Sequence, residues 1–158
     1  MGSPRLKGVK GVSFEVGSVV KISTHLARHK HDRQRQTVLF EGGRHAVSRF
    51  KVLEKFGSPQ VVSLIECWLE TGRTHQIRVH MSFKGNNILG DKKYKKKFKK
   101  FKNIDEDLNN KILNLDRQFL HAKQLGFDHP RIGERLEFSS NIPIELNDIL
   151  KKLRKLSK

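Results

Sequence analysis

Four basic or imidazole side chains stand close together in the middle of the chain, at the start of a predicted helix. They are Arg73, His75, Arg78 and His80. The first turn of a helix exposes free N–H groups at the positive end of its dipole, and cationic side chains added there favour an anion. Residue types and spacing alone support an anion site and a merely basic polar face equally well.

A run of lysines at residues 92–102 carries the densest positive charge in the chain. Such a run can follow a phosphate backbone, and aromatic side chains within it can stack on unpaired bases. Here Phe98 and Phe101 are three residues apart, which instead suits side chains that point into a core. We therefore predict that the charge binds RNA, through Lys92, Lys93, Lys95, Lys96, Lys97, Lys99 and Lys100.

The charge balance of the whole chain points to a polyanionic partner. Its 158 residues hold 33 Lys and Arg against 16 Asp and Glu, a formal net charge of +17. A compact domain repels itself at that charge unless it binds a polyanion, and nucleic acid is the first candidate. An anionic membrane surface is second, but no apolar run approaches spanning length, so we expect no membrane partner. A single cysteine, Cys67, excludes an internal disulfide and favours a reducing compartment such as the cytoplasm.

Several common sites do not fit the sequence. It contains neither a Walker-type phosphate loop nor a Gly-rich dinucleotide fingerprint, and one cysteine excludes a Cys-rich zinc knuckle. His25, His29 and His31 lie in a polar stretch, residues 25–33, that we interpret as an exposed loop. The acidic residues between Asp105 and Asp116 are spaced like the ligands of a calcium-binding loop, but Asn110 stands where the sharp turn of such a loop needs glycine. We predict no metal and no cofactor.

Two periodicities define the elements that must position these side chains. Alternating apolar residues predict an antiparallel meander up to Glu70, with a hairpin turn at Gly42-Gly43. The predicted strands cover residues 12–24, 37–40, 46–56, 61–70, 118–127 and 135–138.

Helical spacing follows the fourth strand. It predicts a helix over residues 71–85, capped by Thr71, with core residues Ile77, Val79 and Met81. A short helix or insertion is expected at 105–115. A closing helix begins near Pro143 and buries Leu146, Ile149, Leu150 and Leu153. This order predicts an α+β fold, with a mixed, mostly antiparallel sheet and flanking helices.

Four segments, in sequence order, resemble motifs of the RluA-like pseudouridine synthases. They are residues 43–53, 71–81, 89–94 and 119–130, which include Thr-Gly-Arg-Thr-His-Gln-Ile-Arg-Val-His and Leu-Gly-Asp-Lys-Lys-Tyr. These enzymes isomerise uridine in ribosomal and transfer RNA without a cofactor. The resemblance implies an RNA-binding cleft across the sheet and flipping of the target uridine from its stack.

The resemblance also implies an aspartate nucleophile in a His-Arg-Leu-Asp-like motif upstream of the matched segments. This sequence contains no such motif. A family tyrosine expected upstream also has no clear counterpart, because Tyr94 belongs to a different motif. We therefore interpret residues 1–158 as a single domain, the C-terminal portion of a catalytic domain, able to bind RNA but inactive by itself.

The resemblance assigns roles to the motif at residues 71–81. Arg78 matches the arginine that pairs with the catalytic aspartate and holds it ionised, so we expect it to wait for a carboxylate that this chain does not supply. Arg73, His75 and Gln76 are expected to shape the RNA side of the cleft or to brace the helix.

We expect this synthase portion to be a monomer, with ribosomal RNA as the first candidate for its partner and transfer RNA as the second. Two alternatives stay open beside it. One is a non-catalytic RNA-binding module that kept the fold. The other is a generic basic DNA-binding protein, which would bind duplex DNA and structured RNA with similar salt sensitivity.

Overall fold

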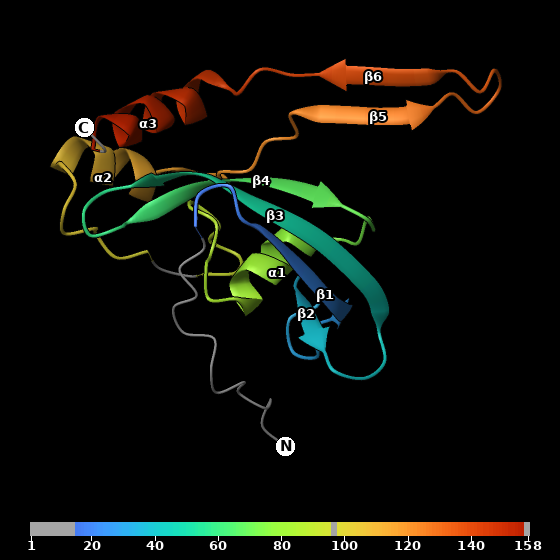
Figure 1. Ribbon diagram of the computed structural model, residues 1–158. Coiled ribbons are helices and arrows are strands. Elements are labelled where there is room, and N and C mark those ends of the chain that lie inside the picture. Colours follow the sequence, from blue (N-terminus) through green and yellow to red (C-terminus); the bar gives the residue numbers. More distant parts are fainter. Residues whose placement is uncertain (1–14, 96–97, 157–158) are drawn as a thin grey trace.

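The computed structural model describes residues 15–95 and 98–156 (Figure 1). The strands are β1 (Val19–Arg28), β2 (Gln36–Leu39), β3 (Arg44–Phe56), β4 (Val62–Leu69), β5 (Gln124–Asp128) and β6 (Arg135–Ser139), and the helices are α1 (Gln76–Phe83), α2 (Glu106–Leu113) and α3 (Ile144–Lys155). The first four strands form one sheet and the last two form a separate ribbon, with every pairing antiparallel. The α+β fold class is confirmed.

The order of the main sheet is β2-β1-β3-β4, which is not the meander predicted from the sequence. Gly42 and Gly43 were expected to make a hairpin turn, but they carry the chain past the end of β1, so β2 and β3 pair with its opposite edges. Both glycines have positive φ, and a Cβ on Gly43 would lie 2.8 Å from the Leu26 carbonyl oxygen. Glycine is therefore required for this close crossing.

Two strand predictions need correction. β1 continues to Arg28, so His25 lies in the sheet opposite Leu39 and His45 instead of in an exposed loop. The strand predicted over residues 46–56 is irregular, because the ladder between β3 and β4 shifts register between Val52 and Glu54 and Leu53 is exposed there. A bulge of this kind inserts one residue without a partner and bends the strand.

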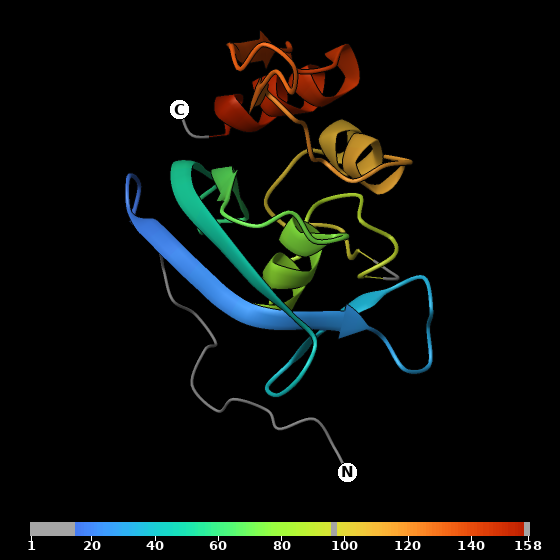
Figure 2. The same ribbon diagram turned by 90° about the vertical axis from the view of Figure 1, so that its right-hand side faces the viewer.

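Helix α1 lies within the curve of the sheet (Figure 2). Of its predicted apolar stripe only Val79 is buried, where it packs with Leu26, Ala46 and Tyr94. Ile77 and Met81 are half-buried. The face toward the sheet instead carries two buried polar residues, Gln76 and His80. The helix is therefore held by hydrogen bonds as well as by apolar contact.

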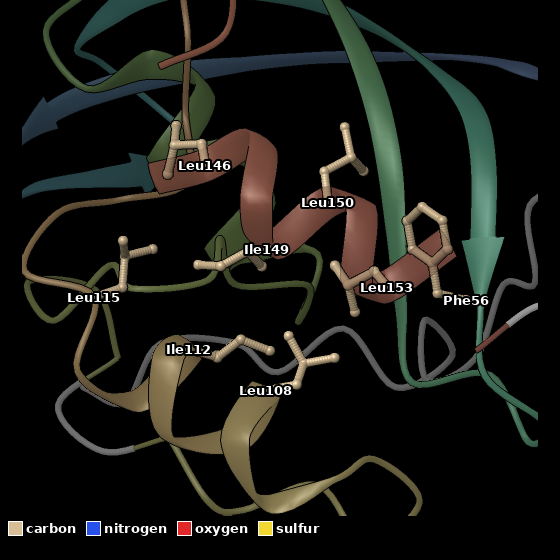
Figure 3. Packing of buried hydrophobic residues seen from close by; sticks show 8 residues of the cluster. All are labelled: Phe56, Leu108, Ile112, Leu115, Leu146, Ile149, Leu150 and Leu153. Atoms are coloured by element: carbon tan, nitrogen blue, oxygen red, sulfur yellow. The ribbon is translucent and has the colours of Figure 1, made fainter. Parts of the chain in front are cut away.

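A second core joins α2 and α3 to the end of β3 (Figure 3). The predicted apolar face of α3 is confirmed, because Leu146, Ile149, Leu150 and Leu153 are all buried. They pack with Phe56, Leu108, Ile112 and Leu115. Asp105 caps α2, where its side chain accepts the amide N–H of Leu108 at 2.8 Å, so the segment at 105–115 is a helix.

The strand predicted over residues 118–127 begins only at Gln124. The chain before it contacts the motif at residues 89–94, because the Phe119 amide donates to the Leu89 carbonyl at 2.7 Å. The helices in residues 15–95 and 98–156 are all too short or too polar to cross a bilayer.

Candidate functional site

The candidate site is the start of α1, where the chain takes an uncommon backbone conformation. His75 precedes the helix with φ 55°, in the left-handed region. This conformation costs a residue with a Cβ about 1–2 kcal/mol. The imidazole does not cap the helix. Its Nδ1 lies 3.1 Å from the Tyr94 hydroxyl, and that contact fixes the ring over the loop at residues 91–95.

Tyr94 is the centre of the cluster. Its hydroxyl accepts the amide N–H of Gln36 at 2.9 Å, which leaves the hydroxyl proton to be donated to His75. Burial raises the pKa of Tyr94. Burial, and then the cations of Arg78 and Lys93, lower the pKa of His75. Both groups are therefore neutral near pH 7, as a hydroxyl-to-imidazole hydrogen bond requires.

Two guanidinium groups lie against the Tyr94 ring, with Arg35 at 5.2 Å and Arg78 at 5.0 Å from its centroid. The Nε of Arg35 is buried and has no hydrogen-bond partner among the described residues. A buried donor without a partner costs free energy. Two cations therefore contact the same Tyr94 ring, and this positive charge favours an anionic ligand nearby.

Arg78 has a carboxylate partner within the chain, contrary to the expectation that it would have none. Its Nε and Nη2 donate to the two carboxylate oxygens of Asp91, at 2.8 and 2.7 Å. The Asp91 side chain is 1% exposed and the Arg78 side chain 13%. The bond to Asp91 raises the pKa of Arg78. A guanidinium has five N–H donors, and no hydrogen bond from Nη1 is found among the described residues, so Nη1 can donate to a second acceptor.

Gln76 was expected to shape the RNA side of the cleft or to brace the helix, and its burial rules out direct contact with RNA and favours the second role. It is 2% exposed, and its Nε2 donates to the Val47 carbonyl at 3.0 Å and the Ser48 hydroxyl at 2.9 Å. Its Oε1 accepts from the Thr71 hydroxyl and the Arg73 amide. Gln76 therefore braces the helix. Thr71 is not the cap predicted for α1, because its hydroxyl serves this network and the Val47 amide.

His80 completes the buried polar face of α1. Its two ring nitrogens lie 2.9 Å from the hydroxyl oxygens of Ser48 and Thr24, on β3 and β1. Burial, and then the Lys84 cation, lower the pKa of His80 to about 4. It is therefore neutral near pH 7 and contributes no cation to an anion site, which was one of the two interpretations of this cluster from the sequence.

Arg73 is placed differently. Its Nε donates at 2.9 Å to the carbonyl of His45, the second residue of β3. It is half-buried, as is His75. Both can be reached from solvent beside Arg78, so their predicted RNA contact stays a prediction.

The lysine run is irregular where the structure describes it, and Lys96 and Lys97 lie outside the described residues. Lys92 pairs with Asp116 at 3.0 Å and Lys100 with Glu106 at 3.0 Å. Lys93 is half-buried, whereas Lys95 and Lys99 are exposed.

Two of the three aromatic side chains of this run pack against a core, and the inward direction predicted for Phe98 and Phe101 is confirmed for Phe101 alone. Tyr94 is buried, and Phe101 packs against the core between α2 and α3. Asn109 of α2 binds both backbone polar groups of Phe101, at 2.8 and 3.0 Å. Phe98 is half-buried below the Lys95 ammonium. The run is thus fixed at both ends, while part of its charge faces solvent.

Sequence reasoning missed Arg35 and Asp91. Asp91 stood in a recognised motif, but nothing in its spacing pairs it with Arg78. Arg35 lies between the loop predicted at residues 25–33 and the strand predicted at 37–40, in a stretch to which no role was assigned. Across residues 15–95 and 98–156, no three His, Cys, Asp or Glu side chains gather as metal ligands. In the histidine-rich loop, His29 Nδ1 accepts the amides of His31 and Asp32, which shapes a local turn.

Comparisons with known proteins show which family this chain resembles. The family described as RNA pseudouridylate synthase matches residues 15–83, which end with α1. The uncharacterized RNA pseudouridine synthase YlyB of Bacillus subtilis is 43% identical over 134 residues, 85% of this chain and 39% of its own length. Ribosomal large subunit pseudouridine synthase D of Vibrio cholerae is 39% identical, over 87% of this chain and 41% of its own.

Solved structures show the same fold. Human RNA Pseudouridylate Synthase Domain Containing 1 superposes with a TM-score of 0.56 at 26% identity, over 80% of this chain and 49% of its own. The chain spans about two fifths of the length of the two bacterial relatives. On sequence and fold together, the chain belongs to the RluA-like family of RNA pseudouridine synthases.

Proposed function

We propose that this chain is the RNA-binding, C-terminal portion of a pseudouridine synthase catalytic domain, and that it needs an aspartate from a further segment to isomerise uridine. The observation that carries the proposal is that Tyr94, in the family-like segment 89–94, contacts the guanidinium groups of Arg35 and of Arg78, which lies in the family's most recognisable motif. The family resemblance makes ribosomal RNA the first candidate for the substrate and transfer RNA the second. The absence of a His-Arg-Leu-Asp motif supports the need for a further segment.

The geometry gives Arg78 a defined part in this reaction. The target uridine is flipped out of its stack, its glycosidic bond is broken, and the ring is reattached through carbon. With Asp91 on Nε and Nη2, the guanidinium is fixed in direction and offers Nη1 to the aspartate nucleophile. An adjacent cation keeps that carboxylate ionised and oriented. Asp91 itself is buried behind Arg78, so we assign it no contact with RNA.

The test is turnover on total ribosomal and transfer RNA, comparing this chain with a version extended upstream in its coding sequence. We expect pseudouridine from the extended version alone. Arg78→Met in that version should abolish turnover, whereas Arg154→Met, at an exposed pair with Glu54 remote from the site, should not. Turnover by the 158 residues alone would refute the need for a further segment.

RNA binding is tested separately with the 158 residues. Replacing the exposed Lys95 and Lys99 by Gln should weaken binding to loop-containing RNA and flatten the salt dependence. The log–log slope should fall by roughly 0.7–0.9 for each phosphate that the variant no longer neutralises. Equal affinity for duplex DNA and structured RNA would instead support a generic basic protein.

A non-catalytic RNA-binding module is the second candidate. It is favoured by the Arg78–Asp91 pair, because the guanidinium already has a counter-ion without any nucleophile. Sequencing upstream of Met1 separates the two. A His-Arg-Leu-Asp motif in frame supports the synthase, and its absence together with RNA binding supports the module.

A further inference from the structure

The ribbon of β5 and β6 has one apolar face and one charged face. Leu125 lies opposite Phe138, and Phe127 lies opposite Leu136. Residues directly opposite in an antiparallel pair point to the same side of the sheet, so these four apolar side chains share one face. The rings of Phe127 and Phe138 stack on it, with centroids 6.0 Å apart.

The opposite face satisfies its own charges. Arg135 pairs with Asp128 at 3.4 Å and with Glu137 at 3.6 Å. Its guanidinium covers Gly126, where a Cβ would lie 2.5 Å from the Arg135 Nη2. This face needs no partner.

The apolar face is uncovered in this structure. Leu125 is 60% exposed, Phe138 55% and Phe127 40%. Figure 1 shows the ribbon extending away from α3, beyond the helices that build the second core. An isolated two-stranded ribbon is at best marginally stable in water, and exposed apolar clusters of this kind mark contact surfaces.

We propose that this face is an interface for the remaining polypeptide of an RluA-like synthase, the part of the relatives' length that has no counterpart in these 158 residues. The match covers 39% of the Bacillus subtilis relative and 49% of the human solved chain. More than half of each polypeptide is therefore left over, which is ample to cover one side of a ribbon. The identity of this occupant rests on the proposed function, but the interface does not require turnover.

Two other possible occupants, a second copy of this chain and RNA, fit the surface less well. Three partly exposed side chains offer roughly 300 Å², given about 150–250 Å² for a whole aromatic side chain, whereas a stable dimer needs about 800 Å² from each partner. The remaining polypeptide of a synthase is expected to contact other parts of this chain as well, so this face has to supply only part of that interface. RNA is disfavoured because the face carries no cation, and the Arg135 guanidinium on the other face is already paired.

The first experiment co-expresses this chain with a tagged polypeptide that holds the part of the Bacillus subtilis relative outside the match. We expect the two to co-purify. Phe127→Ser together with Phe138→Ser should weaken the complex about tenfold or more, as for other buried aromatic contacts. The matched control, Gln124→Ser with Glu137→Ser on the charged face, should not. Because all four positions are exposed in the isolated chain, its own urea midpoint should hardly change.

A second measurement does not depend on the solubility of that segment. In a chimera that joins the two parts, Leu125→Cys should react with a thiol reagent about tenfold more slowly than Gln124→Cys, its neighbour on the opposite face. In the 158 residues alone both should react rapidly, while the half-buried Cys67, whose pKa is raised, gives little background.

Three results would overturn the interface. Leu125→Cys and Gln124→Cys could react equally in the chimera. The 158 residues could sediment as a dimer that Phe138→Ser converts to a monomer, which assigns the face to a second copy. RNA affinity could fall with Phe138→Ser but not with Glu137→Ser. A complex that forms but makes no pseudouridine would support the interface and count against the proposed function.

Discussion

Asp91→Asn is the substitution that tests the site most directly, because it removes one charge and almost no volume. Asp91 is 1% exposed and receives two hydrogen bonds from Arg78, whose side chain is 13% exposed. In the variant the mostly buried Arg78 guanidinium has no counter-ion. The Arg35 guanidinium, which contacts the same Tyr94 ring, adds further positive charge nearby. We expect the start of α1 and the loop at residues 91–95 to loosen together.

The expected cost follows from the burial of the pair. Removing one partner of a buried ion pair costs about 3–5 kcal/mol. The lower end applies here, because Asn keeps one acceptor and Arg78 keeps some solvent contact. A loss of about 3 kcal/mol lowers the melting temperature of a domain this size by roughly 6–12 °C and is readily seen as a lower urea midpoint.

The assay is urea unfolding followed by circular dichroism at neutral pH. Asp116→Asn is the matched control, because its pair with Lys92 is exposed, at 96% for Asp116, and should contribute nothing measurable. Arg78→Met with Asp91→Leu should recover most of the lost stability, since an apolar pair replaces both charges. Equal midpoints for Asp91→Asn and Asp116→Asn would refute the reasoning.

Three further predictions concern buried groups. Gly90→Ala should cost about 3 kcal/mol, because φ is +71° and the added Cβ would lie 2.1 Å from the Arg117 carbonyl oxygen. Gly72→Ala, with nothing within 4 Å, should leave the urea midpoint unchanged. His80 has a folded pKa of about 4, below its unfolded 6.5, so the unfolded chain takes up the proton first. Stability should therefore be full above pH 6.5 and fall by up to about 3 kcal/mol as pH drops to 4, a loss that urea midpoints should show for the wild type and much less for His80→Gln. Cys67 is half-buried, and desolvation raises its pKa to about 12, so its reaction with a thiol reagent at pH 8 should be roughly a thousandfold slower than in urea; equal rates would contradict this desolvation.

The elements and the family could be predicted from the sequence because their signals are local. The face of α3 was found correctly, since Leu146, Ile149, Leu150 and Leu153 repeat with the period of a helix and meet a single core. The sheet order was not, because alternation shows that a strand exists but not which edge it pairs with. Only the close approach of Gly43 to Leu26 takes β3 to the far side of β1.

The candidate site was found in part. Sequence reasoning singled out Arg78, but Asp91 became its partner only when α1 and the loop after it were folded against each other. Gln76 and His80 looked like cleft residues because polar side chains are usually exposed. The sheet supplies Val47, Ser48 and Thr24 as hydrogen-bond partners, which offset the cost of burying both side chains.

Composition and motif order, read from the sequence by itself, determined the basic charge, the α+β class and the RluA-like family, because each depends on residue types or on neighbours along the chain. The tertiary structure decided the hydrogen bond of Gln36 to Tyr94 and the two guanidinium groups on that ring, which join residues far apart in sequence. It also decided that the apolar residues of β5 and β6 share one open face, because strand register, which the alternating pattern alone does not fix, sets which side chains lie together.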